Sequence, residues 1–249
     1  MSDPTHRETE TVTPADWPAV LPEVYEHAKR RALETLATEG ERRVQDRLAV
    51  FYDSESNYAG SSFAELAPNE WWDITPADLH ATTLLSVDIG PAATRRLIAP
   101  GATRQGVLRA LRGLPDRELA FADADTLTAM EGFYRAIKVA LGSASAHTSN
   151  PWVTASKLCA RKRPDLFPVR DRNVCGHLGI IDLNDFRVDW LVFRALAQDD
   201  DVIAAVDDLP SSIRAADTGR LLAVDSSRLR LLDAAIWTYT TWYRERGDA

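Results

Sequence analysis

Apolar residues recur at helical spacing along most of the chain. Within 126–141, positions 127, 130, 134, 137 and 141 are apolar, and positions 229, 232, 236, 239 and 242 repeat this spacing within 225–245. Steps of three and four residues place such side chains on one face of a helix. No segment alternates between apolar and polar residues strongly enough to predict a strand. The pattern therefore predicts a predominantly α-helical, all-α fold.

Capping residues mark where several helices are expected to begin. Thr75 and Asp78 flank Pro76 in the arrangement of a helix start, and Asp123 precedes the 126–141 helix in the same way. Thr13 before Pro14 gives a similar signal and predicts a helix that runs to about Thr38. The remaining expected helices are 41–51, 79–87, 91–98, 102–111, a short one after 151, 171–178, 184–198, 200–207 and 225–245. Residues 1–13 are expected to be disordered, 52–74 irregular and 142–150 a loop of small residues.

Composition places the chain among globular proteins with a substantial core. It has 249 residues, of which 45% are hydrophobic and 27% charged, enough to bury a core without disulfides. Two cysteines, Cys159 and Cys175, do not form a disulfide framework, and they indicate a reducing compartment. Residues 1–13 are polar and no apolar run reaches the roughly 20 residues that span a membrane. The expected location is the cytoplasm.

The segment 151–172 carries the strongest chemical signal. The net charge of −8 argues against a protein that coats nucleic acid, yet this segment concentrates positive charge. Its basic residues are Lys157, Arg161, Lys162, Arg163, Arg170 and Arg172. Phe167-Pro168 predicts an extended turn, after which Asp171 begins a helix. A carboxylate there, beside a basic helix, is a candidate catalytic group for chemistry on a polyanion. Spacing alone favours the other interpretation, in which Asp171 is a structural helix cap and the basic residues form a solvated face.

Other kinds of site find no support in the sequence. The chain has no glycine-rich phosphate loop, no Gly-x-Ser-x-Gly and no metal-ligand spacing among its five histidines. The acidic runs 199–201 and 207–208 are typical of solvated helix ends. No metal and no cofactor are therefore expected.

Residues 151–179 resemble the helix-hairpin-helix DNA glycosylases, and most of all the branch that removes alkylated bases. The matching elements are Pro151-Trp152-Val153-Thr154-Ala155, then 163–171 (Arg-Pro-Asp-Leu-Phe-Pro-Val-Arg-Asp), then Leu178-Gly179. The chain also resembles an uncharacterised bacterial domain family through Ala-Ser-Lys-Leu-x-Ala-Arg-Lys-Arg-Pro at 155–164. An upstream element of that family matches 78–87, Asp-Leu-His-Ala-Thr-Thr-Leu-Leu-Ser-Val.

The glycosylase resemblance implies a role for each matched residue. Asp171 corresponds to the catalytic carboxylate, which would stabilise an oxocarbenium-like sugar or activate water. The partner would be double-stranded DNA with a flipped base. Candidate aromatic residues for the base pocket are Trp152, Trp71, Trp72, Tyr52 and Tyr58. Candidate phosphate contacts are Ser149, Asn150, Lys157, Arg161, Arg170 and Arg172. Residues 14–249 would form one glycosylase-like unit, or two sub-domains around a cleft, with the core motifs in 75–178.

Departures from the glycosylase pattern narrow these expectations. The phosphate-binding hairpin of that family is rich in glycine, whereas 147–150 are His-Thr-Ser-Asn. Around the position where bifunctional members carry their Schiff-base lysine, this chain has Trp152 and Val153, which predicts a monofunctional enzyme. The four-cysteine iron–sulfur loop of some relatives is also absent, because the chain has two cysteines. The resemblance implies alkylated purines as substrates, which would make the protein a repair enzyme. Bulky modified bases of phage DNA are the other candidate substrates, and they would imply a role in defence. The alternatives are a non-enzymatic module that binds nucleic acid or protein, and an enzyme acting on nucleosides or RNA. An open pocket at Asp171, lined by aromatic and basic residues, would favour an enzyme.

Overall fold

The described part of the protein consists of helices and the loops that connect them. The computed structural model describes residues 13–142, 151–217 and 219–244. Within these ranges the only β-type pairing is an isolated bridge between Asp53 and Leu222, so the all-α prediction is confirmed. The α-helices are α1 (Pro22–Thr35), α2 (Val44–Phe51), α3 (Ser62–Glu65), α4 (Pro76–Thr83), α5 (Pro91–Ile98), α6 (Ala102–Arg112), α7 (Ala124–Leu141), α8 (Trp152–Lys162), α9 (Arg172–His177), α10 (Phe186–Gln198), α11 (Asp200–Asp207), α12 (Leu209–Ala216) and α13 (Arg228–Arg244), with short 3-10 turns η1 (Leu119–Phe121) and η2 (Ile181–Leu183).

Three helix starts lie where their caps predicted them. The Asp78 side chain accepts a hydrogen bond from the backbone N of Thr75 at 2.9 Å, which closes the start of α4. Asp123 accepts from the Thr126 backbone N at 2.9 Å, and Asp171 accepts from the Val174 backbone N at 2.9 Å. These carboxylates satisfy backbone N–H groups that have no partner inside the helix.

The first helix begins later than the sequence pattern predicted. Residues 13–21 are not helical, and α1 starts at Pro22 after an extended Leu21. Pro18 and Pro22 explain the difference, because proline inside a helix removes a hydrogen bond and clashes with the preceding turn. The predicted helix 79–87 is also wrong at its end: α4 stops at Thr83, and 84–87 turn away with Ser86 in a left-handed conformation (φ 59°). The sequence pattern gave no indication of α3 and α12.

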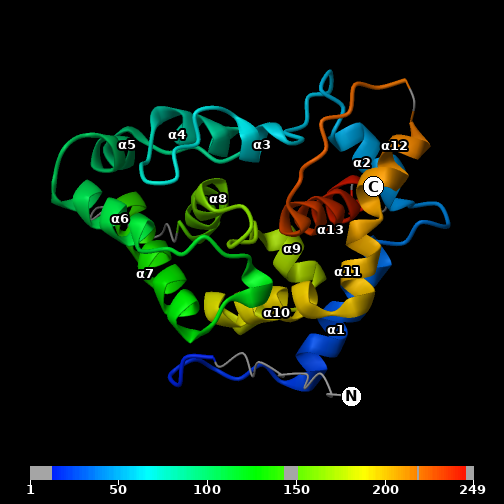
Figure 1. Cartoon of the computed structure of the whole chain (residues 1–249), viewed down its shortest axis with the longest axis horizontal. Coiled ribbons are helices and arrows are strands. Elements are labelled where there is room, and N and C mark those ends of the chain that lie inside the picture. The colour runs from blue at the N-terminus through cyan, green and yellow to red at the C-terminus, as the bar shows by residue number, and fades with distance from the viewer. Residues whose placement is uncertain (1–12, 143–150, 218, 245–249) are drawn as a thin grey trace, which may run out of the picture.

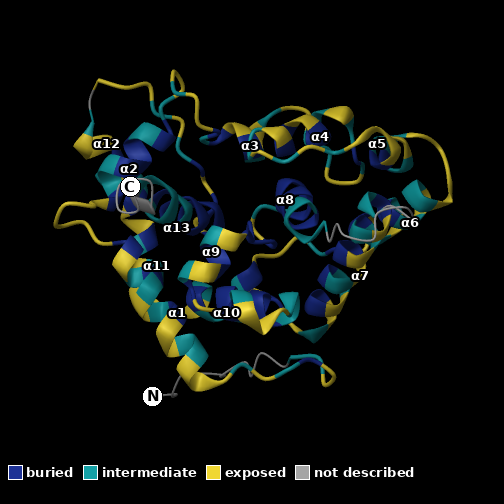
Figure 2. Ribbon diagram, turned by 180° about the vertical axis from the view of Figure 1, so that it is seen from behind, coloured by how far each residue is buried: buried dark blue, intermediate teal, exposed yellow. Residues whose placement is uncertain are grey.

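Helices α8 and α9 lie near the centre of the molecule, with the other helices arranged around them (Figure 1). Helix α8 packs against α3, α4 and α7, and α9 packs against α13. Every residue of α8 from Ala155 to Lys162 is buried, and the helix is dark throughout that stretch in Figure 2. A helix with three basic residues is therefore part of the core.

Gly179 ends the segment that contains α9, and its conformation requires glycine. Its φ is +74°, and a Cβ there would lie 2.7 Å from the ring of His27. We expect Gly179→Ala to lower the free energy of unfolding by about 1–2 kcal/mol, the usual cost of a left-handed conformation for a residue with a Cβ.

Gly176, three residues earlier, provides the matched control. It lies inside α9, and a Cβ at this position would have no neighbouring atom within 4 Å. Gly176→Ala should be neutral or raise stability by about 0.5–1 kcal/mol, because alanine favours helix over glycine. Urea denaturation of the two variants checks both signs. Equal effects at positions 176 and 179 would contradict this interpretation.

The predicted disordered tail lies outside the described residues, apart from Thr13. Within the described ranges, no helix is both long enough and apolar enough to cross a membrane.

Candidate active site

A pocket of about 450 Å³ opens beside Asp171. Six segments form it: the end of helix α2, the loop 57–59, the turn 84–86, helix α8, residues 169–174 and helix α13. A volume of this size lies within the range of about 300–1,000 Å³ that is usual for small-molecule sites. We call this cavity the Asp171 pocket.

Asp171 enters the pocket from the N-terminal end of α9. Its Oδ1 accepts the hydrogen bond from Val174 that caps this helix. The residue is 8% exposed, so the carboxylate is largely shielded from water yet lines the cavity. Ser156 fixes the preceding turn, because its hydroxyl donates to the carbonyl of Pro168 at 3.1 Å and accepts from the backbone N of Arg170 at 2.9 Å.

Lys157 reaches the same pocket from α8. The sequence pattern placed this side chain among the outward phosphate contacts, but the structure buries it beside Asp171. Its ammonium group donates to the carbonyl of Leu85 at 2.6 Å. Burial lowers the pKa of Lys157, and the negative charge of Asp171 partly offsets that effect. Lys157 therefore supplies a partly desolvated positive charge inside the cavity.

Arg230 and Asp233 form a second charged pair on the α13 wall. The Arg230 Nη1 donates to Asp233 Oδ2 at 2.7 Å, and the same oxygen accepts from the Val169 backbone N at 2.8 Å. The guanidinium also lies 5.0 Å from the centre of the Phe63 ring. Both residues are almost fully buried, and both line the Asp171 pocket.

Aromatic and aliphatic side chains supply the remaining walls. Tyr58 and Trp237 meet edge to face with their rings 6.5 Å apart, and Phe51 packs 6.0 Å from Trp237. Leu84 and Leu85 face the same cavity from the turn after α4. Tyr58 is 41% exposed, which puts it at the rim. The pocket thus combines flat apolar surfaces with four charged groups.

A buried ion cluster joins the two sequence elements 78–87 and 155–164. Asp78 Oδ1 accepts from Arg161 Nε at 3.0 Å and Asp78 Oδ2 accepts from Lys162 Nζ at 2.8 Å, with all three side chains completely buried. Arg161 also donates to the carbonyls of residues 63, 64, 66 and 68, and Lys162 donates to Asn69 at 2.9 Å. The cluster fixes the position of α4 relative to α8. The turn 84–86, which follows α4, therefore lies next to Lys157 on α8.

The predicted phosphate contacts divide into three groups. Arg161 is 0% exposed and Arg170 is 3% exposed; Arg170 pairs with the buried Asp189. These two side chains are part of the core and have almost no surface that could contact DNA. The prediction that they contact phosphates is therefore wrong. Arg172 is exposed, as such a contact requires. Ser149 and Asn150 lie outside the described residues.

Of the five predicted base-pocket aromatics, one lines the Asp171 pocket. That residue is Tyr58. Tyr52 is buried, and its hydroxyl donates to Asp225 at 3.0 Å. Trp71 and Trp72 are exposed and pack edge to face with each other, 5.5 Å between ring centres. Trp152 borders a different pocket, where it stacks 5.3 Å from the guanidinium of Arg170.

Four charged or aromatic residues of the site were missed in the sequence: Phe51 on α2, and three residues on α13. Arg230, Asp233 and Trp237 follow one another at steps of three and four residues, so they share a face of α13. This face lies beside the apolar stripe of the same helix. Two opposite charges and a tryptophan at helical spacing, next to the apolar stripe of α13, were the available signal.

A polar pocket of about 710 Å³ adjoins the Asp171 pocket. Asn173 lines both, and Arg42, Arg172, His177 and Tyr239 line the larger one. The guanidinium of Arg42 lies 5.4 Å from the centre of the Tyr239 ring. Basic groups therefore flank the carboxylate on the side of α9.

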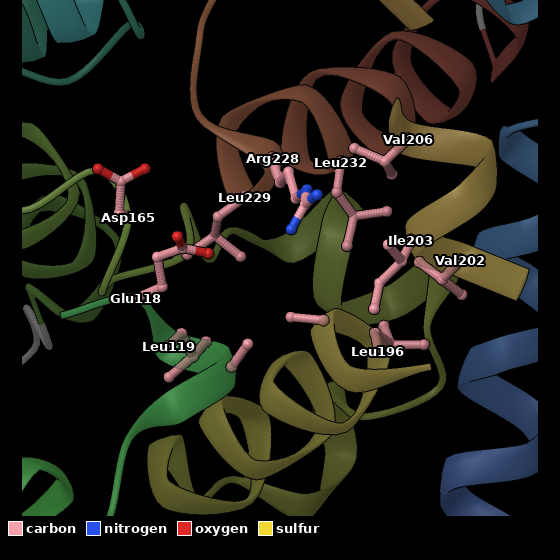
Figure 3. Close-up of a pocket in the computed structure, with 12 residues that line it drawn as sticks. Glu118, Leu119, Asp165, Leu196, Val202, Ile203, Val206, Arg228, Leu229 and Leu232 are labelled. Carbon is pink, nitrogen blue, oxygen red and sulfur yellow. The ribbon is translucent and has the colours of Figure 1, made fainter. Parts of the chain in front are cut away.

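A further pocket is too small to hold a ligand. It measures about 30 Å³ and lies between η1, α10, α11 and α13. Figure 3 shows Leu119, Leu196, Val202 and Leu232 turned toward it. A space of that size holds about one water molecule.

Among the described residues, no group of histidine, cysteine and acidic side chains could hold a metal ion. Cys159 and Cys175 are free and buried, and burial raises the pKa of both thiols. A thiol kept protonated is a weak nucleophile and a poor metal ligand.

A family model matches residues 44–240 of the chain. This protein belongs to DUF6308, a family of unknown function. The segment that defines DUF6308 in this chain contains every residue that lines the Asp171 pocket. It also contains the whole Asp78–Arg161–Lys162 cluster. No curated protein and no solved structure matches the chain.

Proposed function

We propose that this protein is a monofunctional DNA N-glycosylase, in which Asp171 assists cleavage of the bond between a modified base and its sugar. The observation that carries the proposal is the composition of the Asp171 pocket. Two shielded carboxyl groups, two buried cations and three aromatic rings converge there from segments distant in the sequence. The hydrogen bond of Asp171 goes to a backbone group, the N of Val174, but the residue lines an open pocket. A sealed Asp171 bonded only to backbone amides would have favoured the binding module.

The chemistry of the pocket matches the demands of glycosidic cleavage. Loss of the base leaves positive charge on the sugar, which a nearby carboxylate stabilises, as in other glycosyl hydrolases. The base must leave the stack and enter a pocket, where flat side chains such as Tyr58 and Trp237 can contact it. Asp171 meets the first demand, and the α13 and 57–59 walls meet the second.

DNA would approach along the polar pocket beside α9. Arg172 and Arg42 line it, and it continues into the Asp171 pocket at Asn173. Arginine forms forked hydrogen bonds with phosphate. We therefore assign phosphate contacts to these two arginines, with Lys157 nearer to the sugar. The free, buried cysteines favour a reducing compartment, the cytoplasm. Base repair and defence against modified phage DNA both fit this reaction.

The alternative is a binding module without enzymatic activity. The net charge of −8 and the structural use of Arg161 and Arg170 favour it. Such a module would bind DNA or a protein and release no base.

Base-release profiling distinguishes the two functions. Wild-type protein is incubated with alkylated, oxidised and hypermodified phage DNA, and freed bases are identified by mass spectrometry. We expect release of one class of modified base. We expect no covalent adduct with DNA when borohydride is present, because the Lys157 amine is held in a hydrogen bond to the Leu85 carbonyl and is not free to attack the sugar. DNA binding without release from any of these DNAs would support the module, and a borohydride-trapped adduct would contradict the monofunctional mechanism.

A further inference from the structure

Three adjoining cavities meet at residues 171–173. The polar pocket shares Asn173 with the Asp171 pocket, and it shares Arg172 and Ile181 with a further cavity of about 290 Å³. We call this further cavity the Trp152 pocket. The three cavities follow one another in the order Asp171 pocket, polar pocket, Trp152 pocket, and we call this row of cavities the track.

The Trp152 pocket has aromatic walls and balanced charge. Trp152, Tyr134 and Phe186 line it. The rings of Tyr134 and Phe186 lie 4.7 Å apart between centres, and Trp152 is half-buried. Apart from the shared Arg172, its charged residues are two cations and two carboxylates: Lys138, Arg170, Asp182 and Asp189. Nucleobases stack on exposed aromatic rings whatever their sequence, so this pocket suits a base better than a phosphate.

The polar pocket in the middle of the track is positively charged. Arg42 and Arg172 line it, and none of its lining residues is acidic. Arg172 is exposed, and its side chain makes no hydrogen bond or ion pair with the residues that the structure describes. Its guanidinium is therefore available to a ligand. In a chain of net charge −8, such a cavity attracts phosphate, which arginine binds through two parallel hydrogen bonds.

The order of these surfaces matches one nucleic-acid strand. Aromatic rings line both ends of the track and arginines line its middle. A strand alternates in the same way, because a phosphate links each base to the next. One base can occupy the Asp171 pocket, the linking phosphate the polar pocket, and the neighbouring base the Trp152 pocket.

The track suits an unpaired strand better than a duplex. Rings recessed in cavities reach only bases that have left the stack. Duplex DNA is held mainly through phosphate contacts with a basic outer surface. Two of the residues predicted to form such a surface, Arg161 and Arg170, are buried.

We infer that the track binds a single DNA strand with two neighbouring unpaired bases, and that Trp152 stacks on the base next to the target. The inference rests on the proposed function for the target base in the Asp171 pocket. It replaces the double-stranded partner that the resemblance implies. Trp152 thereby has a base-contacting role, but at the neighbouring base and not at the reacting one.

Binding to unmodified oligonucleotides tests the track separately from base release. A fluorescently labelled strand of about 12 nucleotides, within the range of single-strand site sizes, is titrated with the full-length protein. The duplex with its complement is titrated in the same way, and anisotropy is measured at about 50–200 mM salt. We expect the single strand to bind at least about tenfold more tightly than the duplex, because only the strand offers bases for stacking.

Two variants examine the two kinds of surface. Trp152→Ala should weaken single-strand binding by about tenfold or more, the usual effect of losing one stacked base. Trp152→Phe keeps a ring and should recover part of that loss, and thermal unfolding shows whether each variant folds. Arg172→Gln should reduce the slope of log affinity against log salt by about 0.7, the value for one phosphate of a single strand.

Trp72→Ala and Arg95→Gln are the matched controls. Trp72 is 43% exposed, Arg95 is exposed on α5, and neither lines any cavity of the track. Both variants should keep the wild-type affinity and the wild-type salt slope.

Two results would overturn the track. They are binding of the duplex as tightly as the single strand, and single-strand binding that neither Trp152→Phe nor Arg172→Gln alters. Base release is scored separately, with the modified base placed in a single strand and in a duplex, and we expect faster release from the single strand. If the wild type frees the base but fails the binding tests, the glycosylase proposal stands and the track fails. If strand binding follows expectation and neither form loses a base, the track stands and the proposed function fails.

Discussion

Asp171→Asn is expected to lower the rate of base release by about 10²–10³-fold or more, the usual cost of removing one group that stabilises transition-state charge. Asparagine has the same shape but no charge, so the developing positive sugar loses its stabilising partner. The start of α9 should survive, because asparagine caps helices about as well as aspartate and can still accept from Val174 N. Single-turnover base release and urea denaturation together measure the two effects.

Asp123→Asn is the control for this variant. Asp123 caps α7 with the same geometry, and its carboxylate accepts from Thr126 N at 2.9 Å, but it does not line the Asp171 pocket. Hydrogen bonds from Thr126 lower the pKa of Asp123 to about 2. Its stabilising charge is present above the pKa of an unfolded aspartate, about 4, and is lost as the pH falls toward 2. Asp123→Asn should therefore reduce stability slightly at pH 7 and leave base release unchanged. Equal loss of activity in both variants would show that Asp171 acts only through the fold.

Asp78→Asn is expected to lower the free energy of unfolding by about 3–5 kcal/mol, as when one partner of a buried ion pair is removed. Arg161 and Lys162 would remain buried with their charges uncompensated. Burial already lowers the pKa of Lys162 and Asp78 opposes that effect, so the variant should lower the pKa of Lys162 further. A lysine whose pKa is lower in the folded than in the unfolded state makes stability rise with pH. The loss measured by urea denaturation should therefore be smaller at pH 9 than at pH 6.

Asp46→Asn gives the comparison at the surface. Asp46 pairs with Arg43 at 2.7 Å, and each side chain is about half exposed. An exposed pair is worth about 0–1 kcal/mol, so this variant should unfold almost as the wild type does. Similar losses from Asp46→Asn and Asp78→Asn would contradict the structural role of the buried cluster.

Local signals predicted the helices better than their limits. Apolar spacing and the caps at Asp123 and Asp171 predicted α7 and α9, because both signals act within one turn of a helix. The limits of α1 and α4 were wrong. At α1 the prolines at 18 and 22 outweighed the cap signal of Thr13, and at α4 the chain turns away after Thr83 to face α8. The latter depends on tertiary contacts that periodicity does not encode.

Three residues of the Asp171 pocket, Lys157, Asp171 and Tyr58, were candidates from the sequence, and the residues of α13 were missed. Asp171 could be predicted because a turn that contains Pro168 precedes it and a helix follows it. The role of the basic residues could not be predicted, because burial of Arg161 depends on Asp78, which is 83 positions away. Arg230 and Asp233 approach Asp171 only when α13 packs against α9. Sequence proximity could not indicate that contact.

The most direct test of the central claim is to follow the oxygen that replaces the base. Wild-type protein and Asp171→Asn are incubated in ¹⁸O-labelled water with DNA that carries the base identified by profiling, and both products are examined by mass spectrometry. We predict that the wild type releases free base and leaves an abasic sugar with one ¹⁸O at C1′, and that Asp171→Asn forms both products at least about 100-fold more slowly. Release of an intact nucleoside, or binding of that DNA with no change in its mass, would contradict a hydrolytic glycosylase centred on Asp171.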